Sequence, residues 1–412
     1  MQDLGSRVRQ LRKERKLTLA QLAGDRLTKG MLSLIENGKA QPSMESLHYI
    51  AGQLQVDVSS LLGEEGESFK ELMLELEEMR NSLANEQSNS YVIAQNIIDK
   101  VTPIVDQLQK NRYEHVRIRE IYSNAMVIIT EKLDEQVFYE IMDCYEAIHA
   151  YSRLLTCYNF LSWYYYDKKQ FYKALELLQQ AEQRMEQYWL LIDDISGIGL
   201  FHNLMVMYYA VSDGEKGAFY KEKVLEIAGK RKIYYRMDVF YHTLFVQAIS
   251  DNQFEECETY LKKLYLISQL AEEEEMVLYY LFCRAHYLNT IDKNYEQVLH
   301  FLQEEVYIQK GEPFNLMEVL YKIEESIALY HIKKYEEALA ICENVKIPKF
   351  YKHPLELCIF YRFVAYRALM YQKLGDYESA KRDILYAAHG VESYPANFYT
   401  NFIRETYEQI MK

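Results

Sequence analysis

Apolar residues recur every three to four positions along this chain, from one end to the other with few interruptions. This spacing places them on one face of a helix, so the pattern predicts α-helices throughout. Glycine (15 residues) and proline (6 residues) are scarce, which favours long helices with short connections over a sheet-rich fold. The expected fold class is therefore all-α.

The first 63 residues carry the signals of a compact domain of five short helices. The pattern predicts them over residues 4–15, 19–24, 29–37, 44–54 and 58–62. Thr18 stands three residues before Gln21, which is the spacing of a capping box at the start of the second helix. The second and third helices are joined by the four-residue turn 25–28. Such a pair is a helix-turn-helix, whose later helix enters the DNA major groove.

The third helix has clear signals at both ends. Thr28 can cap its start, and Gly38 is placed to end it in the left-handed conformation. Met31, Leu32 and Ile35 are expected to face inward.

This head resembles the lambda-repressor-like, or XRE-type, family of DNA-binding domains over residues 4–63. The matching residues are Leu17-Thr18-x-x-x-Leu22-Ala23, Leu27-Thr28, Ile35-Glu36-Asn37-Gly38-Lys39 and Pro42-Ser43. The resemblance implies a structural ion pair between Arg12 and Glu36. Two positions depart from the family: Leu19 replaces a polar residue that touches phosphate, and Gly30 stands where a base is usually read.

A set of polar residues on and around the third helix forms the expected DNA surface. Its members are Thr28, Lys29, Ser33, Asn37 and Lys39. Lys29 is the expected base reader, because its ammonium group can donate to guanine O6 and N7 or to phosphate. The others are expected to position the domain on the backbone. The alternative is that all five are ordinary solvated polar residues.

Charge divides the chain at the end of this head. The net charge is −14, but residues 1–63 hold nine Lys/Arg against six Asp/Glu, a net of +3, and the remainder has a net of −17. An acidic body repels phosphate, so DNA contact is expected only at the head. The predicted domains are the head at 1–63, a linker with a helix over about 69–83 at 64–90, and a body at 91–412. The glycines and carboxylates of residues 63–68 and the polar residues 85–90 are the expected breaks.

The body repeats a short string, an aromatic residue followed three positions later by a small or apolar one. The copies are Phe171-x-x-Ala174, Phe254-x-x-Cys257, Tyr295-x-x-Val298, Tyr335-x-x-Ala338 and Tyr377-x-x-Ala380, with a degenerate copy around Ala218. The last four are 41, 40 and 42 residues apart, so the period indicates a solenoid of helix pairs. The small residue allows close helix approach, and the aromatic is expected to fill the gap to the next pair.

The string resembles the tetratricopeptide repeat, which implies a right-handed α-solenoid. Six units are expected over residues 151–390, with degenerate units before them and a capping helix over 397–411. Pro103 is expected to kink or break a helix.

The first helix of each unit is expected to line a concave face that binds an extended peptide. Asn159, Asn203 and His242 occupy matching places, and side-chain amides can pair with a peptide backbone. Their neighbours one or two turns on complete the candidate site: Trp163, Tyr166, Met207 and Val246. The alternative is that the two asparagines satisfy neighbouring helix backbones and that His242 is structural.

Other chemistry is not indicated. The six cysteines lie in apolar helical patterns without CxxC spacing, so reduced, buried thiols are expected. The sequence has no phosphate-binding loop, nucleophile elbow or metal-spaced cluster, so we expect no enzyme, no metal and no cofactor. No apolar stretch is long enough to span a membrane, and a cytoplasmic protein without a membrane partner is expected. The acidic run 272–275 is interpreted as a solvated helix start.

Head, helical linker and repeat body together resemble the peptide-pheromone receptors of the Rap–Rgg–NprR–PlcR–PrgX group, most closely the NprR type. The resemblance implies a transcription regulator of quorum sensing or sporulation that binds a short signalling peptide. A homodimer or higher homo-oligomer would present two heads to a palindromic operator. The alternative from another class is a regulator whose body sequesters a response regulator of a phosphorelay.

Overall fold

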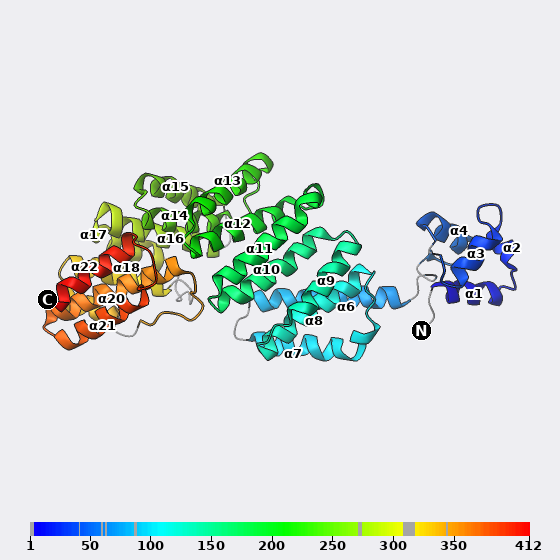
Figure 1. Ribbon diagram of the computed structural model, residues 1–412, viewed down its shortest axis with the longest axis horizontal. Coiled ribbons are helices and arrows are strands. Elements are labelled where there is room, and N and C mark those ends of the chain that lie inside the picture. The colour runs from blue at the N-terminus through cyan, green and yellow to red at the C-terminus, as the bar shows by residue number, and fades with distance from the viewer. Residues whose placement is uncertain are drawn as a thin grey trace. The chain divides into compact units, whose positions relative to one another are not determined.

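The computed structural model describes residues 4–40, 42–58, 61, 64–85, 89–270, 274–307, 318–342 and 345–412. Helices are its only regular secondary structure in those ranges, as the sequence predicts (Figure 1). The chain divides into two compact units, residues 1–154 and 155–412, with the boundary inside helix α10.

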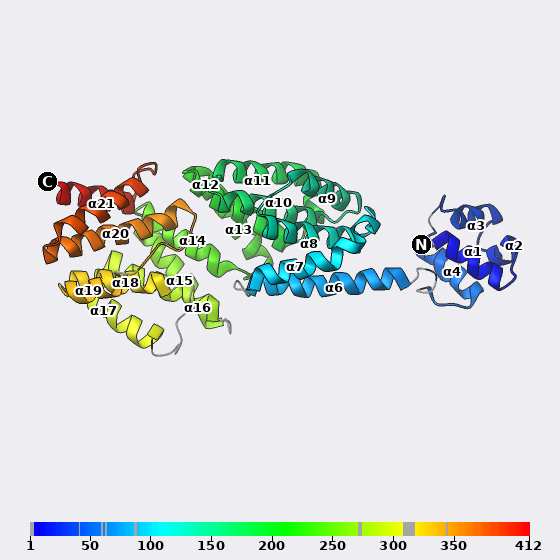
Figure 2. The ribbon, with the colours of Figure 1, turned by 90° about the horizontal axis from the view of Figure 1, so that it is seen from below.

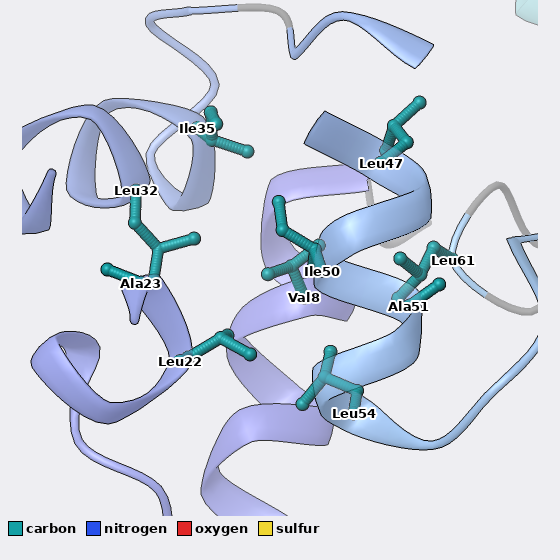
Figure 3. Close-up of a cluster of buried hydrophobic side chains, with 10 residues drawn as sticks. All are labelled: Val8, Leu22, Ala23, Leu32, Ile35, Leu47, Ile50, Ala51, Leu54 and Leu61. Atoms are coloured by element: carbon teal, nitrogen blue, oxygen red, sulfur yellow. The ribbon is translucent and has the colours of Figure 1, made fainter. Parts of the chain in front are cut away.

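The head consists of α1 (Leu4–Glu14), α2 (Leu19–Ala23), α3 (Lys29–Glu36) and α4 (Met44–Leu54). Its core gathers buried aliphatic side chains from all four helices, and Figure 3 shows Leu22 pointing toward Val8 and Ile50. The predicted capping box between Thr18 and Gln21 is present. Most of the helix expected over residues 58–62 lies outside the described residues.

The second part of the first unit contains α6 (Glu64–Asn85), α7 (Ser90–Val101), α8 (Tyr113–Thr130) and α9 (Glu135–Ala147). The expected linker at 63–68 is wrong for residues 64–68, because α6 begins at Glu64 and takes in Gly66. As predicted, α7 ends just before Pro103, and the 3-10 turn η2 (Thr102–Gln107) follows. Residues 86–88 of the second expected break lie outside the described residues.

Six helix pairs follow, as the period predicts. They are α10 (Tyr151–Asp167) with α11 (Phe171–Met185), α12 (Asp194–Ala210) with α13 (Gly214–Arg231), α14 (Met237–Ser250) with α15 (Phe254–Leu270), α16 (Glu274–Tyr287) with α17 (Tyr295–Phe301), α18 (Glu318–His331) with α19 (Tyr335–Cys342), and α20 (Pro354–Leu374) with α21 (Tyr377–Gly390). Three short segments extend single helices: the 3-10 segment η3 (Glu186–Leu191) follows α11, and the π-helical segments η4 (Leu288–Asp292) and η5 (Leu302–Tyr307) follow α16 and α17. The predicted capping helix is α22 (Phe398–Met411). Only the last two residues of the acidic run 272–275 are described, and they start α16.

The repeated string marks the start of the second helix in five of the six pairs. Its aromatic residue is the first residue of α11, α15, α17, α19 and α21. The small or apolar residue three positions later is buried in every copy, as expected for close helix approach. The aromatic residues are less buried than expected, because Tyr377 is 61% exposed and Phe254 is 37% exposed. A helix start lies at the edge of the interface, where a large ring reaches solvent.

Contacts in the second unit extend beyond neighbouring pairs. The first helices of consecutive pairs pack on one another from α14 to α20, and Figure 2 shows α20 beside α21. Helix α14 also contacts α20 and α22, which come several pairs later in the chain. The inner side of α14 is therefore covered by later parts of the same chain.

All six cysteines are buried free thiols, as predicted. Burial raises the pKa of Cys257 and of Cys358 to about 12, so neither thiolate forms at neutral pH. Among the described residues, no helix is both long enough and apolar enough to cross a bilayer.

Candidate nucleic-acid interface and candidate peptide-binding face

Thr28 caps the start of α3, and Lys29 is the first residue of the helix. The Thr28 hydroxyl accepts a hydrogen bond from the backbone N–H of Met31 at 3.1 Å, which satisfies one of the free amides at the helix start. Lys29 is the next residue, and its side chain is exposed. The ammonium group therefore projects from the end of the helix that a helix-turn-helix presents to DNA.

The end of α3 is held by a second polar pair. The Asn37 side chain donates to the Ser33 carbonyl at 2.7 Å, and Gly38 adopts a φ of +67°. Lys39 follows and is exposed. Ser33 and Asn37 thus share one face of the helix with Lys29, as expected, and Asn37 is oriented by its own helix.

The sequence pattern is wrong for Met31. This residue was expected to face inward, but 45% of it is exposed, while Leu32 and Ile35 are buried. Leu34 is also exposed, at 44%. At about 100° per residue, Leu34 lies about 60° around the helix from Asn37, whereas Met31 lies about 160° from Ser33. Apolar side chains in the major groove contact the thymine methyl group, so Leu34, which sequence reasoning missed, joins the candidate interface.

The predicted ion pair fixes α3 against α1. Arg12 donates to both carboxylate oxygens of Glu36, at 2.5 and 2.8 Å, and to the Leu17 carbonyl at 2.9 Å. Glu36 is only 6% exposed, and its hydrogen bond raises the pKa of Arg12. Two parallel bonds set both distance and orientation, so α1 holds the candidate recognition helix in a fixed pose.

In the second unit, Asn159 and Asn203 meet across the first helices of two neighbouring pairs. Asn203 Nδ2 on α12 donates to Asn159 Oδ1 on α10 at 3.0 Å. The bond uses one amide hydrogen and one carbonyl lone pair out of the larger capacity of the two side chains. The two amides thus form a polar pair on the first helices, as the matching positions predict.

Aromatic residues flank this pair on α10. Trp163 is 42% exposed, and its ring meets Tyr166 edge to face with centroids 4.6 Å apart. A half-exposed indole next to an amide pair suits contact with peptide side chains and backbone.

Two of the remaining predicted contacts are not at a surface. Met207 is 1% exposed and Val246 is 2% exposed, so their assignment to an accessible face is wrong. Four residues along a helix add about 400°, a full turn plus about 40°, so these two side chains lie beside Asn203 and His242 on the side that packs against a neighbouring helix. The ring of His242 lies 4.8 Å from Tyr279, and burial lowers the pKa of His242 to about 4. His242 is thus a neutral packed ring, in agreement with the structural alternative.

Comparisons with known proteins match the two parts of the chain separately. Residues 8–61 match the family model described as helix-turn-helix, and residues 154–187 match the model described as tetratricopeptide repeat. The immunity repressor protein of Bacillus phage phi105 is 43% identical over 63 residues, which span 15% of this chain and 44% of the repressor. Neither family model is that of an enzyme.

Similar solved structures cover most of the chain at low identity. PlcR of Bacillus thuringiensis, in complex with the peptide PapR7 and DNA, is 15% identical and covers 84% of this chain and 100% of its own, with a TM-score of 0.34. The SHP pheromone receptor Rgg2 of Streptococcus dysgalactiae is 14% identical and covers 70% of this chain and 99% of its own, with a TM-score of 0.31. The chain thus has a helix-turn-helix domain at residues 8–61, a tetratricopeptide repeat at residues 154–187, and an all-α body of helix pairs in its described residues.

Proposed function

We propose that this chain is a sequence-specific DNA-binding transcription regulator whose repeat body binds a short signalling peptide. The observation that carries the proposal is the head. Its third helix is held rigidly at both ends and against α1, and it exposes Lys29 with polar and apolar neighbours. Such a surface can combine phosphate contacts with base contacts.

The repeat body would regulate DNA binding by the head. The amide pair of Asn159 and Asn203, with the exposed Trp163 beside it, offers groups that an extended peptide can pair with. A peptide acts only through a difference in affinity between two arrangements of the body. A homodimer or higher homo-oligomer then presents two heads to a palindromic operator, as in quorum-sensing regulators of the NprR type.

DNA binding is tested by titrating genomic fragments and following fluorescence anisotropy at several salt concentrations. Lys29→Ala is expected to weaken binding about tenfold and to reduce the salt slope by about 1, because one phosphate or base contact is lost. Lys13→Ala is the matched control, since Lys13 is an exposed lysine on α1 of the same domain. Equal losses in both variants would contradict a specific role for α3.

Peptide binding is tested by calorimetry with peptides from adjacent small reading frames. Asn159→Ala and Asn203→Ala are each expected to lower peptide affinity, whereas Asn401→Ala, an exposed asparagine on α22, is expected to leave it unchanged. If peptide affinity were unchanged in both Asn159→Ala and Asn203→Ala, the two asparagines would not belong to the peptide-binding site. Capture of a response regulator by a chain that binds no DNA would favour the sequestering alternative instead.

A further inference from the structure

A helix-free segment before α20 differs in charge from the rest of the body. We call residues 346–353, with the sequence Lys-Ile-Pro-Lys-Phe-Tyr-Lys-His, the α20 leader. It contains no helix and connects α19 to α20. It carries three lysines and two aromatic residues, while residues 64–412 together have a net charge of −17. In composition and conformation the leader is a basic peptide within an acidic body.

His353 ties the leader to α12. Its Nδ1 accepts the backbone N–H of Leu355 at 3.2 Å, so the ring proton must lie on Nε2. Nε2 then donates to the backbone carbonyl of Val206 at 3.1 Å, across 147 residues of chain. His353 is 5% exposed, and burial lowers its pKa to about 4, so the neutral ring persists at neutral pH.

Two further contacts tie the leader to α10. The ammonium group of Lys352 lies 3.3 Å from a carboxylate oxygen of Asp167, the last residue of that helix. The backbone of His353 also faces Tyr166, the residue before Asp167, and partly offsets the rise in the Tyr166 pKa that burial causes. Side-chain charge, side-chain ring and main chain of the leader all take part, as they do when a peptide is bound.

The helices that hold the leader are those that carry the amide pair. Tyr166 lies two turns after Asn159 on α10, and Val206 lies one turn after Asn203 on α12. The leader therefore occupies the carboxyl-terminal part of the face on which peptide binding is expected.

We propose that the α20 leader is an intramolecular ligand of the α10–α12 face and competes there with an incoming extended peptide. The inference rests on the proposed peptide-binding function. With the leader in place, only the fraction of molecules with a free face binds peptide, so apparent affinity falls by that fraction. Displacement of the leader frees the start of α20. Binding of a peptide to α10 and α12 therefore changes a helix pair that lies far along the chain.

The test uses the chain's own sequence as the probe, because the natural peptide is not needed. A synthetic peptide with the sequence of residues 346–353, blocked at both ends, is titrated into the full chain. The double variant Lys352→Ala with His353→Asn weakens the leader, and asparagine retains the helix-capping function of His353. Lys349→Ala is the matched control, because Lys349 is an exposed lysine of the same segment.

The double variant is expected to bind the probe at least tenfold more tightly than the wild-type chain. Amide hydrogen exchange of residues 346–353 should accelerate in the same variant, and Lys349→Ala should match the wild type in both measurements. Adding Asp167→Asn to the double variant should remove part of the gain, because the probe loses its carboxylate partner.

Equal affinity in the wild type and the double variant, or no binding of the probe to either, would overturn the inference. These outcomes are separate from failure of the proposed regulator. A chain that binds the probe but no genomic fragment would contradict DNA binding and leave the intramolecular ligand standing.

Discussion

At the scale of single residues, the clearest constraint in the head is at Gly24. This residue ends α2 with a φ of +51°, and a Cβ atom added there would lie 2.0 Å from the Tyr49 hydroxyl oxygen. Gly24→Ala therefore combines backbone strain with displacement of a ring on α4. We expect the head to lose about 2 kcal/mol of stability, measured by amide hydrogen exchange of α3 and α4.

Gly52→Ala provides the control within the same domain. Gly52 lies inside α4, and no atom lies within 4 Å of an added Cβ. Alanine favours a helix over glycine, so this variant should protect α4 slightly more, by up to about 1 kcal/mol. Comparable losses in the two variants would mean that neither the left-handed backbone nor the Tyr49 contact matters.

Local sequence signals were sufficient to predict the helix caps of the head. Thr18 with Gln21, Thr28 and Gly38 were all predictable, because capping depends on residue type and on a spacing of a few residues. The exposure of Met31 was not predictable, because it depends on which side of α3 faces α1 and α4. From sequence alone, an apolar residue at helical spacing is predicted to be buried, and only the positions of the neighbouring helices show whether it is.

At the scale of elements, α6 is fastened to α8 by one carboxylate. Glu77 on α6 accepts from Arg117 Nε and Nη2 at 2.5 and 2.8 Å, from Arg80 at 2.9 Å and from Arg153 at 3.2 Å. Arg117 is only 1% exposed, so loss of the carboxylate leaves a buried cation short of partners. We expect Glu77→Gln to cost about 3 kcal/mol and to speed hydrogen exchange throughout α6 and α8.

Lowering the pH should weaken the contact between Glu77 and Arg117. Burial raises the pKa of Glu77, but the hydrogen bonds and charges of Arg117 and Arg80 outweigh it and hold the pKa at about 2. A depressed pKa gives stability that is present above the ordinary value near 4.5 and is lost as the pH falls toward 2. The difference between wild type and Glu77→Gln should therefore shrink over that interval. Glu78→Gln, which removes an exposed carboxylate from the same helix, is the control, and a constant difference for Glu77→Gln would contradict the assignment.

The ends of helices were predictable where a particular residue type marks them. They were not predictable where packing against other helices determines the end. The aromatic anchors mark the first residues of five second helices, and Pro103 marks the end of α7. Gly66 suggested a linker, yet it lies within the first turn of α6. Glycine costs a helix only about 1 kcal/mol, and a 22-residue helix packed on α7 and α8 offsets that cost.

At the scale of the whole molecule, a repeat period predicts the contacts between neighbouring pairs but not those between distant ones. The period gives six pairs and a final cap, as observed. It gives no indication that α14 contacts α20 and α22, or that His353 reaches Val206. These contacts depend on a small rotation from pair to pair, which accumulates along the array. For this reason Val246, which the repeat predicts on an accessible face of α14, is buried, and the His242 ring packs on Tyr279.

A buried polar cluster in the second unit joins α16, α18 and α22. His286 Nδ1 lies 2.7 Å from a Glu324 carboxylate oxygen, and His286 Nε2 lies 2.9 Å from the Tyr399 hydroxyl. All three side chains have 0% exposure, so water cannot replace a lost partner. Tyr399→Phe should therefore cost about 1–3 kcal/mol and loosen α22, measured as faster hydrogen exchange in α22 and α16. Tyr407→Phe, on the same helix but only half-buried, should leave exchange unchanged. If Tyr399→Phe also left it unchanged, apolar packing alone would close the array, and the polar cluster would contribute nothing to holding α22 in place.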